Sequence, residues 1–383
     1  MLFSVGQISS SRTNESNLPE SEVREPDWKV AASHPLKSNK IDDALREELT
    51  KRHIAGASVA VVRNGQVILA KGYGSANIEK SVPAMPKTIY QIGSTTKPFT
   101  AMAIMMLVEN GSISLGEKAA KYLAKLPAQY GEITIRQLLT HTSGVNRDLR
   151  TGNADDFTLD EFWKRLATAP ASFKPGERWE YSNTGYILLG MIIESVAKKS
   201  YGEFLNERIF KPLGMKNTSY LEPPGNSKNR AVGYDWVGNA FSPSPYFSGG
   251  YGAGGLVSTV TDLAKWDAAL DRENLLKRSS LEQMWMPARL SDGKLVSFEF
   301  RGERSSYGFG WFLTSYRGRK VVTHGGTVSG FSSQVMRFVD DRITIIVNTN
   351  SKSGADRIGH AEFLAQSVAD IYVPNLAPVS SSR

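Results

Sequence analysis

The 383-residue sequence contains no cysteine, so disulfide bonds, cysteine-ligated zinc sites and thiol nucleophiles are all excluded. Its five histidines form no H-E-x-x-H motif and no pair spaced four residues apart, and a bound metal is therefore not expected. No apolar run approaches the roughly 18 residues that a membrane-spanning helix needs. The sequence also lacks G-x-S-x-G, the motif that carries the nucleophilic serine of an α/β-hydrolase.

Basic residues outnumber acidic ones, but they are spread along the chain. The net charge is +8, and no tract of Lys and Arg interleaved with aromatic residues occurs, so nucleic acid is not an expected partner. Hydrophobic residues make up 40% and charged residues 22%, which is ordinary for a globular protein. A chain of this length is long enough for one large domain or two lobes with a sizeable core.

The beginning of the chain differs from the rest. Residues 1–40 are polar and rich in Ser, Asn, Glu and Pro, which predicts a disordered leader or the remnant of a targeting segment. The first six residues resemble the end of a trimmed signal peptide and slightly favour a secreted or periplasmic protein. They lack the basic start and the apolar stretch of a complete signal.

Strand patterns lie near both ends of the remaining sequence, and helix patterns lie mostly between them. The predicted strands are 57–62, 66–73, 307–314, 320–323, 330–338 and 343–348. The predicted helices are 41–52, 94–110, 137–144, 158–167, 183–198, 201–210, 261–270 and 355–372. Asn64-Gly65 predicts a hairpin turn between the first two strands, and the helix at 261–270 is expected to have Thr261 or Asp262 near its cap.

This order predicts an α+β fold in which an antiparallel sheet is flanked by helices and carries an inserted, mostly helical lobe. The predicted boundaries are 41–375 for the domain, 41–114 and 249–375 for its α/β lobe, 115–248 for its helical lobe, and 376–383 for a tail.

A glycine-rich segment, Gly250–Gly255, formally matches the dinucleotide-binding pattern G-x-G-x-x-G. That pattern is meaningful only between a strand and a helix of a βαβ unit, and neither a convincing preceding strand nor such a unit is present. A glycine-rich loop beside an active-site cleft is therefore the favoured interpretation, and no nucleotide cofactor is expected.

Ser94 and Lys97 form the most informative pair in the sequence. They lie three residues apart at the start of the apolar run Phe99–Val108, so they are expected to share one helix face. A serine hydroxyl becomes a good nucleophile only when a base is within hydrogen-bond reach. A lysine in an apolar setting has a lowered pKa and can serve as that base. Free N–H groups at the helix start can also face a developing oxyanion.

Two other Ser-x-x-Lys matches compete with this pair. Ser291 and Lys294 enclose Asp-Gly, which is a turn signal, so they need not share a helix face. Ser195 and Lys198 lie late in a helical run and resemble a solvated helix end. Only Ser94 lies at a predicted helix start. Pro98, four residues later, supports this prediction, because proline is tolerated only in the first turn of a helix.

Two later segments could complete a site with Ser94. Tyr181-Ser182-Asn183 is the only Tyr-x-Asn in the chain, and it ends a loop at a predicted helix start. A tyrosine beside an ammonium group can act as a base, although a packed tyrosine with a capping asparagine is the better explanation of this segment in isolation. His324-Gly325-Gly326 ends a strand pattern, and its glycines permit close approach of a substrate or another backbone.

In this order, the three segments resemble the motifs of the serine β-lactamase and penicillin-binding-protein-like superfamily. Class C β-lactamases, family VIII carboxylesterases and D-aminopeptidases are the most similar groups. The resemblance covers about Ile41 to Tyr372, and three stretches support it jointly: Leu138–Gly144, Tyr181–Tyr186 and Gly252–Thr259.

The resemblance implies an active site between the two lobes and assigns roles to individual residues. It implies the following: Ser94 as nucleophile, Lys97 and Tyr181 as proton-transfer groups, Asn183 as an orienting residue, the N–H groups of Ser94 and Thr327 as oxyanion hole, and His324, Gly325 and Gly326 as the substrate-binding third motif. Whether Tyr181 or Lys97 takes the serine proton stays open.

The third motif departs from the usual Lys-Thr-Gly of the family, because His324 replaces a permanent positive charge and Gly325 a hydroxyl. Loss of a charge-assisted hydrogen bond costs about 1.5–3 kcal/mol, so strong penicillinase activity is not expected. With an ordinary histidine pKa of about 6.5, affinity for anionic substrates is predicted to improve as the pH falls.

We therefore predict a serine hydrolase that cleaves a small-molecule ester, amide or β-lactam through an acyl-enzyme, without a metal or cofactor. Two alternatives remain at this point: a non-catalytic binding or scaffolding member of the same fold, and an acyltransferase.

Overall fold

The computed structural model describes residues 35–149, 158–220, 229–352 and 359–378. Most of the predicted leader lies outside these residues, and its last six positions begin helix α1. Five residues of the predicted tail, 379–383, also lie outside them.

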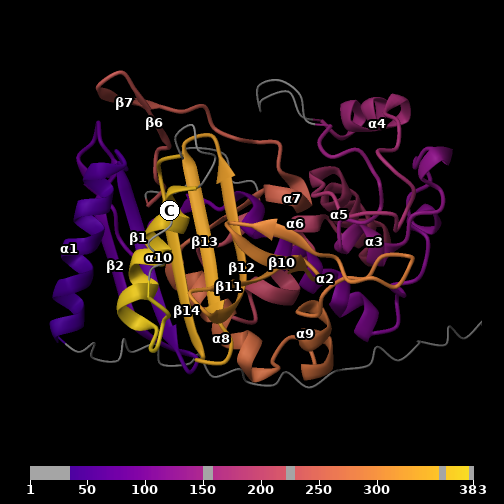
Figure 1. The fold of residues 1–383 in the computed structure, drawn as a ribbon. Coiled ribbons are helices and arrows are strands. Elements are labelled where there is room, and N and C mark those ends of the chain that lie inside the picture. Colours follow the sequence, from indigo (N-terminus) through magenta and orange to yellow (C-terminus); the bar gives the residue numbers. More distant parts are fainter. Residues whose placement is uncertain (1–34, 150–157, 221–228, 353–358, 379–383) are drawn as a thin grey trace, which may run out of the picture.

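The central element is a nine-stranded antiparallel sheet, which confirms the predicted fold class (Figure 1). Its strands, from one edge to the other, are β3 (Val82–Pro83), β2 (Gln66–Asn77), β1 (Gly56–Arg63), β14 (Ile343–Thr349), β13 (Phe331–Phe338), β12 (Arg319–Val328), β11 (Phe312–Tyr316), β10 (Glu303–Tyr307) and β9 (Phe298–Phe300). Strand β1 pairs with β14, so the two ends of the domain meet in the middle of the sheet. At the β1–β2 turn, Asn64 and Gly65 both have positive φ, as the hairpin signal predicts.

Helices cover both faces of the sheet. Alternate residues of a strand point to opposite faces, and both sets are mostly apolar in β1. Val59 and Val61 pack in a cluster with residues of α1 (Pro35–Lys51) and α10 (His360–Tyr372). Ala60 and Val62 belong to a second, larger cluster that includes α2 (Lys97–Glu109) and α8 (Val260–Arg272). The sheet is therefore buried on both sides, which explains its continuous apolar runs.

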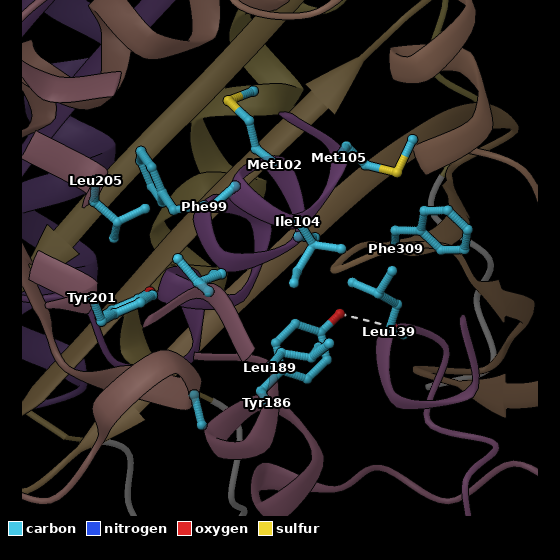
Figure 2. Packing of buried hydrophobic residues seen from close by; sticks show 14 of the residues in the cluster. Phe99, Met102, Ile104, Met105, Leu139, Tyr186, Leu189, Tyr201, Leu205 and Phe309 are labelled. Atoms are coloured by element: carbon cyan, nitrogen blue, oxygen red, sulfur yellow. Dashed lines mark hydrogen bonds between the residues drawn. The ribbon is translucent and has the colours of Figure 1, made fainter. Parts of the chain in front are cut away.

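The second cluster continues from α2 into the helical lobe. This lobe contains α3 (Ile135–Leu139), α4 (Leu159–Thr168), α5 (Asn183–Ala197), α6 (Tyr201–Leu205), a π-helical turn (Asn206–Phe210) and the 3-10 turns η2 (Ala119–Lys121) and η3 (Ala128–Tyr130). Figure 2 shows Phe99 and Ile104 of α2 with Tyr186 and Leu189 of α5, and the Tyr186 hydroxyl donates to the Leu139 carbonyl at 2.8 Å. Because α2 is buried along most of its length, it joins the two lobes.

Smaller elements connect the lobes near α2. A three-stranded sheet contains β4 (Tyr90–Gln91), β8 (Leu256–Ser258) and β5 (Ser219–Tyr220). The 3-10 turn η1 (Gly93–Thr96) follows β4, the short helix α7 (Tyr251–Gly254) precedes β8, and α9 (Arg278–Met284) follows α8.

Several predicted element boundaries differ from those in the structure or lie partly outside the described residues. The run 307–314 is not one strand, because Gly308 and Gly310 form the turn between β10 and β11, where Gly310 has φ +79°. Helix α8 begins at Val260 with Thr259 as its cap, two residues before Thr261 and three before Asp262. The first part of the helix predicted at 355–372 lies outside the described residues, and α10 begins at His360.

Not all of segment 115–248 is helical. Strands β6 (Tyr234–Val237) and β7 (Ala240–Pro243) form a hairpin that Figure 1 shows over the ends of β1 and β2. The Tyr234 hydroxyl accepts a hydrogen bond from the Ile78 N–H at 2.8 Å, and the Val232 N–H donates to the Ala76 carbonyl at 2.9 Å. This hairpin therefore contacts the sheet rather than the helices. The boundaries of the two lobes stay a prediction.

Substitution of Phe99 tests the role of α2 as the joint between the lobes. Phe99 has no exposed surface and stacks on Trp266 of α8 with ring centroids 4.1 Å apart. We expect Phe99→Ala to lower the free energy of unfolding by about 3–5 kcal/mol, measured by urea denaturation. Val237→Ala, at a residue that is 63% exposed, is the control and should change it by less than about 0.5 kcal/mol. Equal losses in both variants would contradict this account of α2.

Candidate active site

The structure brings the Ser94 and Lys97 side chains together. Ser94 lies in the 3-10 turn η1 and Lys97 is the first residue of α2, and side chains three residues apart are eclipsed in such a turn. Lys97 Nζ lies 3.1 Å from Ser94 Oγ. The lysine side chain is completely buried, whereas Ser94 is partly exposed. Pro98 lies in the first turn of α2, as the sequence predicts.

Three oxygen atoms from three separate segments surround Lys97 Nζ. Besides Ser94 Oγ, these are the Ala253 carbonyl of α7 and Asn183 Oδ1 of α5, both at 2.8 Å. Carbonyl oxygens only accept hydrogen bonds, so Lys97 Nζ must donate one N–H to each of these two oxygens. Both a charged and a neutral lysine have enough N–H groups to do so. The position that faces Ser94 Oγ can therefore carry either a proton or a lone pair. This arrangement suits transfer of a proton from the serine hydroxyl to the amine.

The glycine-rich segment 250–255 takes part in this arrangement through its backbone. Most of it forms α7, which packs against α5 and supplies the Ala253 carbonyl to Lys97. A Cβ atom on Gly252 would lie 2.5 Å from the Tyr186 carbonyl oxygen, so only glycine fits there. The glycines therefore serve close packing beside the site, although most of the segment is helical and not the predicted loop.

The competing Ser-x-x-Lys matches occupy different surroundings. Ser195 donates its hydroxyl hydrogen to the Tyr122 carbonyl at 2.8 Å, and Lys198 is the left-handed residue that ends α5, with φ +56°. Ser291 and Lys294 lie in an exposed turn, where Lys294 pairs with Asp292.

Asn183 is oriented by a carboxylate that the sequence analysis did not single out. Its Nδ2 donates to Asp148 Oδ2 at 2.8 Å, while its Oδ1 accepts from Lys97. A carboxylate can only accept, so Asp148 fixes the amide with its oxygen toward the lysine. Asp148 lies in a loop with no motif of its own, and its role depends on contact with a residue 35 positions later.

Tyr181 also lies beside Lys97. The lysine Nζ is 4.7 Å from the centre of the Tyr181 ring, and a cation at this distance favours the negatively charged form of the phenol. The ring stacks against Phe312 of β11 with centroids 6.1 Å apart and lies at the same distance from His324. The segments singled out at Ser94, Tyr181 and His324 therefore converge on one place.

The end of β12 runs directly alongside η1. A Cβ on Gly326 would lie 2.0 Å from the Ile92 carbonyl oxygen and 2.8 Å from the Ser94 nitrogen. A Cβ on Gly93 would lie 3.1 Å from the Thr327 nitrogen. Glycine at 326 is thus required for the approach of the two backbones, and the backbone nitrogens of Ser94 and Thr327 lie at the same junction. Their action as an oxyanion hole stays a prediction.

The expected titration of His324 near neutral pH is wrong. The side chain is only 1% exposed, and burial lowers its pKa to about 3, with the nearby Lys97 charge acting in the same direction. His324 Nδ1 lies 2.7 Å from the Gly325 carbonyl, so this nitrogen carries the hydrogen, and Nε2 accepts from the Tyr307 hydroxyl at 3.2 Å. Both ring nitrogens are engaged within the protein, and the imidazole offers no charge to a substrate carboxylate.

In the described ranges, no cluster of three or more potential metal ligands occurs. Over the same ranges, no helix combines the length and apolar character that crossing a membrane requires.

An antiparallel sheet packed on helices, with a serine and a buried lysine on consecutive turns beside it, defines the fold class of serine β-lactamases and penicillin-binding proteins. A family model described as Beta-lactamase matches residues 41–369. The chain therefore belongs to the beta-lactamase family, whose members are generally serine hydrolases.

Known relatives agree with this assignment. The chain is 32% identical over 331 residues to Protein flp of Staphylococcus aureus strain MW2, covering 82% of this chain and 63% of that protein. A penicillin-binding protein homologue from Pyrococcus abyssi, described as octameric, is 32% identical, with a TM-score of 0.75 over 87% of this chain and 77% of that one. D-amino acid amidase from Ochrobactrum anthropi SV3, solved with D-phenylalanine, is 26% identical, with a TM-score of 0.76 over 88% and 98% of the two chains.

Substitution of Asp148 tests the orientation of Asn183. We expect Asp148→Asn to lower kcat roughly 10- to 100-fold, because the new amide no longer forces Asn183 to face Lys97 with its oxygen. Steady-state hydrolysis of a p-nitrophenyl ester measures the effect. Asp160→Asn, at a side chain 86% exposed on α4, is the matched control. An unchanged kcat in Asp148→Asn would contradict the orienting role.

The lowered pKa of His324 predicts a pH dependence of stability. Between the folded pKa of about 3 and the unfolded value of about 6.5, the unfolded chain binds one more proton, so this histidine makes the fold less stable as the pH falls. The slope is at most about 1.4 kcal/mol per pH unit. Urea unfolding between about pH 5 and pH 6 should show a shallower pH dependence in His324→Gln. The same slope in both proteins would show that His324 is protonated in the fold.

Proposed function

We propose that this protein is a serine hydrolase that cleaves an ester or amide through an acyl-enzyme on Ser94. The observation that carries the proposal is the buried Lys97 amine, 3.1 Å from Ser94 Oγ, with two further contacts to obligate acceptors. An amine held in this way is directed at the hydroxyl and shielded from water. Membership of a family that is generally hydrolytic supports the same activity.

The reaction has two halves. The Ser94 hydroxyl attacks the substrate carbonyl while its proton passes to the pair formed by Lys97 and Tyr181, and the N–H groups of Ser94 and Thr327 stabilise the oxyanion. The same proton then moves to the leaving alcohol or amine as the tetrahedral intermediate collapses. Water attacks the resulting ester by the reverse proton path and regenerates the serine.

Neutral substrates fit this site better than anionic ones. In β-lactamases the third motif supplies a positive charge, and His324 supplies none because it is buried and neutral. We therefore infer that simple esters, or amides without a carboxylate next to the scissile bond, are preferred over penicillins. Compounds of this kind include D-amino acid amides, because the structure resembles that of a D-amino acid amidase.

Replacement of Ser94 tests the nucleophile. Ser94→Ala should abolish hydrolysis of p-nitrophenyl esters and covalent labelling by a fluorophosphonate, while the thermal unfolding midpoint stays unchanged. Ser195→Ala, in a competing motif, is the matched control and should be labelled normally. Turnover above a few per cent of wild type in Ser94→Ala would refute the assignment.

Lack of labelling in the wild type would favour a binding protein, and ester products formed with an added alcohol would indicate an acyltransferase.

Combined substitutions test whether Lys97 and Tyr181 act as one proton-transfer unit. Each of Lys97→Ala and Tyr181→Phe should reduce kcat by roughly 10³-fold or more, and the double variant should be little worse, because groups that act together are not additive. If the loss of kcat in the double variant equals the product of the two single losses, the two residues act independently.

A substrate panel tests the preference for neutral esters. Wild-type kcat/KM should be higher for p-nitrophenyl acetate or butyrate than for nitrocefin. KM for nitrocefin should show no improvement between about pH 7 and pH 5.5, because His324 stays neutral over this range. Nitrocefin turnover equal to that of the esters, or a KM that falls with pH, would contradict the preference.

A further inference from the structure

His141 is a buried residue that the proposed reaction does not use. It lies in the loop that follows α3, its side chain is 1% exposed, and its backbone is left-handed with φ +59°. This conformation is uncommon in residues other than glycine, and histidine is among the residues that adopt it more often. Nε2 is buried without a hydrogen-bond partner among the described residues, which costs free energy. A buried polar atom left without a partner beside the site calls for an explanation other than stability.

His141 forms hydrogen bonds with the residues directly before and directly after Tyr181. The His141 carbonyl accepts from the Glu180 N–H at 3.0 Å. The His141 ring accepts from the Ser182 N–H through Nδ1 at 3.1 Å. Residue 181 is the one position between these two amides. The amides on both sides of Tyr181 are therefore held by one residue of another loop.

The ring of His141 also packs against the ring of Tyr181, with centroids 4.4 Å apart. Tyr186 and Tyr307 lie around the same imidazole, with centroids 5.0 and 4.6 Å away. The contacts thus fix both the backbone and the ring of Tyr181, which stands 4.7 Å from Lys97 Nζ.

One protonation state of His141 is compatible with these contacts. A backbone N–H can only donate, so Nδ1 must keep its lone pair and the ring hydrogen belongs on Nε2. Burial lowers the pKa of His141 well below its usual value, and the charge of Lys97 acts in the same direction. The titratable groups around the ring are Tyr181, Tyr186, Tyr307, Lys97 and His324, and none is a carboxylate that would favour a cationic imidazole.

We propose that His141 is a positioning residue for Tyr181: its backbone carbonyl holds the amide of residue 180, the neutral Nε2–H tautomer of its ring holds the amide of residue 182, and together these contacts keep the Tyr181 ring beside Lys97. The functional part of this inference rests on the proposed role of Tyr181 in proton transfer. The geometric part does not, and it is tested without turnover.

The first test uses nuclear magnetic resonance of the folded protein. With ¹⁵N-labelled histidine, His141 Nδ1 should stay unprotonated from about pH 8 to about pH 5. With tyrosine labelled at Cζ, His141→Gln should move the Tyr181 signal, assigned from Tyr181→Phe, and leave that of the distant Tyr316 in place. A protonated Nδ1 in this range, or an unmoved Tyr181 signal, would overturn the proposal even if the protein hydrolyses nothing.

The second test asks whether His141 acts through Tyr181. We expect His141→Gln to lower kcat for a p-nitrophenyl ester roughly 10- to 100-fold with little change in KM, because a small displacement of a catalytic group has this effect. In a Tyr181→Phe background, the same substitution should cost less than about twofold. A purely structural role predicts the same loss in both backgrounds, and that result would overturn the proposal.

Two further variants guard against a general folding defect. His141→Asn suits the left-handed backbone and keeps a short acceptor, so it should retain the fold and recover part of the lost rate. The matched control is His53→Gln, at another histidine with left-handed backbone, φ +50°, which stacks on Trp236. It should leave kcat and the Tyr181 signal unchanged. Loss of activity in His53→Gln equal to that in His141→Gln would assign the effect to the backbone alone and refute the proposal.

Discussion

The burial of Lys97 is the constraint on which the rest of the structure depends. A lysine amine without exposed surface is costly unless its N–H groups find acceptors. Those acceptors come from η1, α5 and α7, which are far apart in the sequence. Satisfying one nitrogen atom therefore fixes how the helical lobe and the glycine-rich turn meet α2. The apolar surroundings of α2 then keep water away from the amine that faces Ser94.

Close backbone contacts make this meeting possible, and glycines provide them. Gly326 lets β12 lie against η1, and Gly252 lets α7 lie against α5. A Cβ atom at either position would overlap a carbonyl oxygen of the neighbouring segment. The same requirement explains why a sequence that matches a dinucleotide-binding pattern occurs in a protein with a different fold: its glycines serve close packing around the Lys97 amine.

Two buried histidines define the electrostatic character of the site. His141 and His324 have pKa values lowered by burial and, in part, by the charge of Lys97. Each uses Nδ1 in a contact with the backbone, but in opposite senses, because His141 accepts from an N–H and His324 donates to a carbonyl. The tautomers are thus fixed by the surrounding backbone. Because both imidazoles near Tyr181 are neutral, they add no charge to that of Lys97, which lies beside the Tyr181 ring.

Sequence alone determined the features that depend on a few consecutive residues. Three-residue spacing aligns Ser94 with Lys97, and positive φ at Asn64-Gly65 closes the first hairpin, because local backbone geometry decides both. Strand patterns near both ends of the sequence, with helix patterns between them, indicate the α+β fold and its antiparallel sheet. The tertiary structure alone decided what depends on distant contacts. Asp148 orients Asn183, burial and the Lys97 charge keep His324 neutral, and His141 holds Tyr181. A pKa or an amide orientation is set by solvent exclusion and by partners dozens of residues away, and neither is contained in a local pattern.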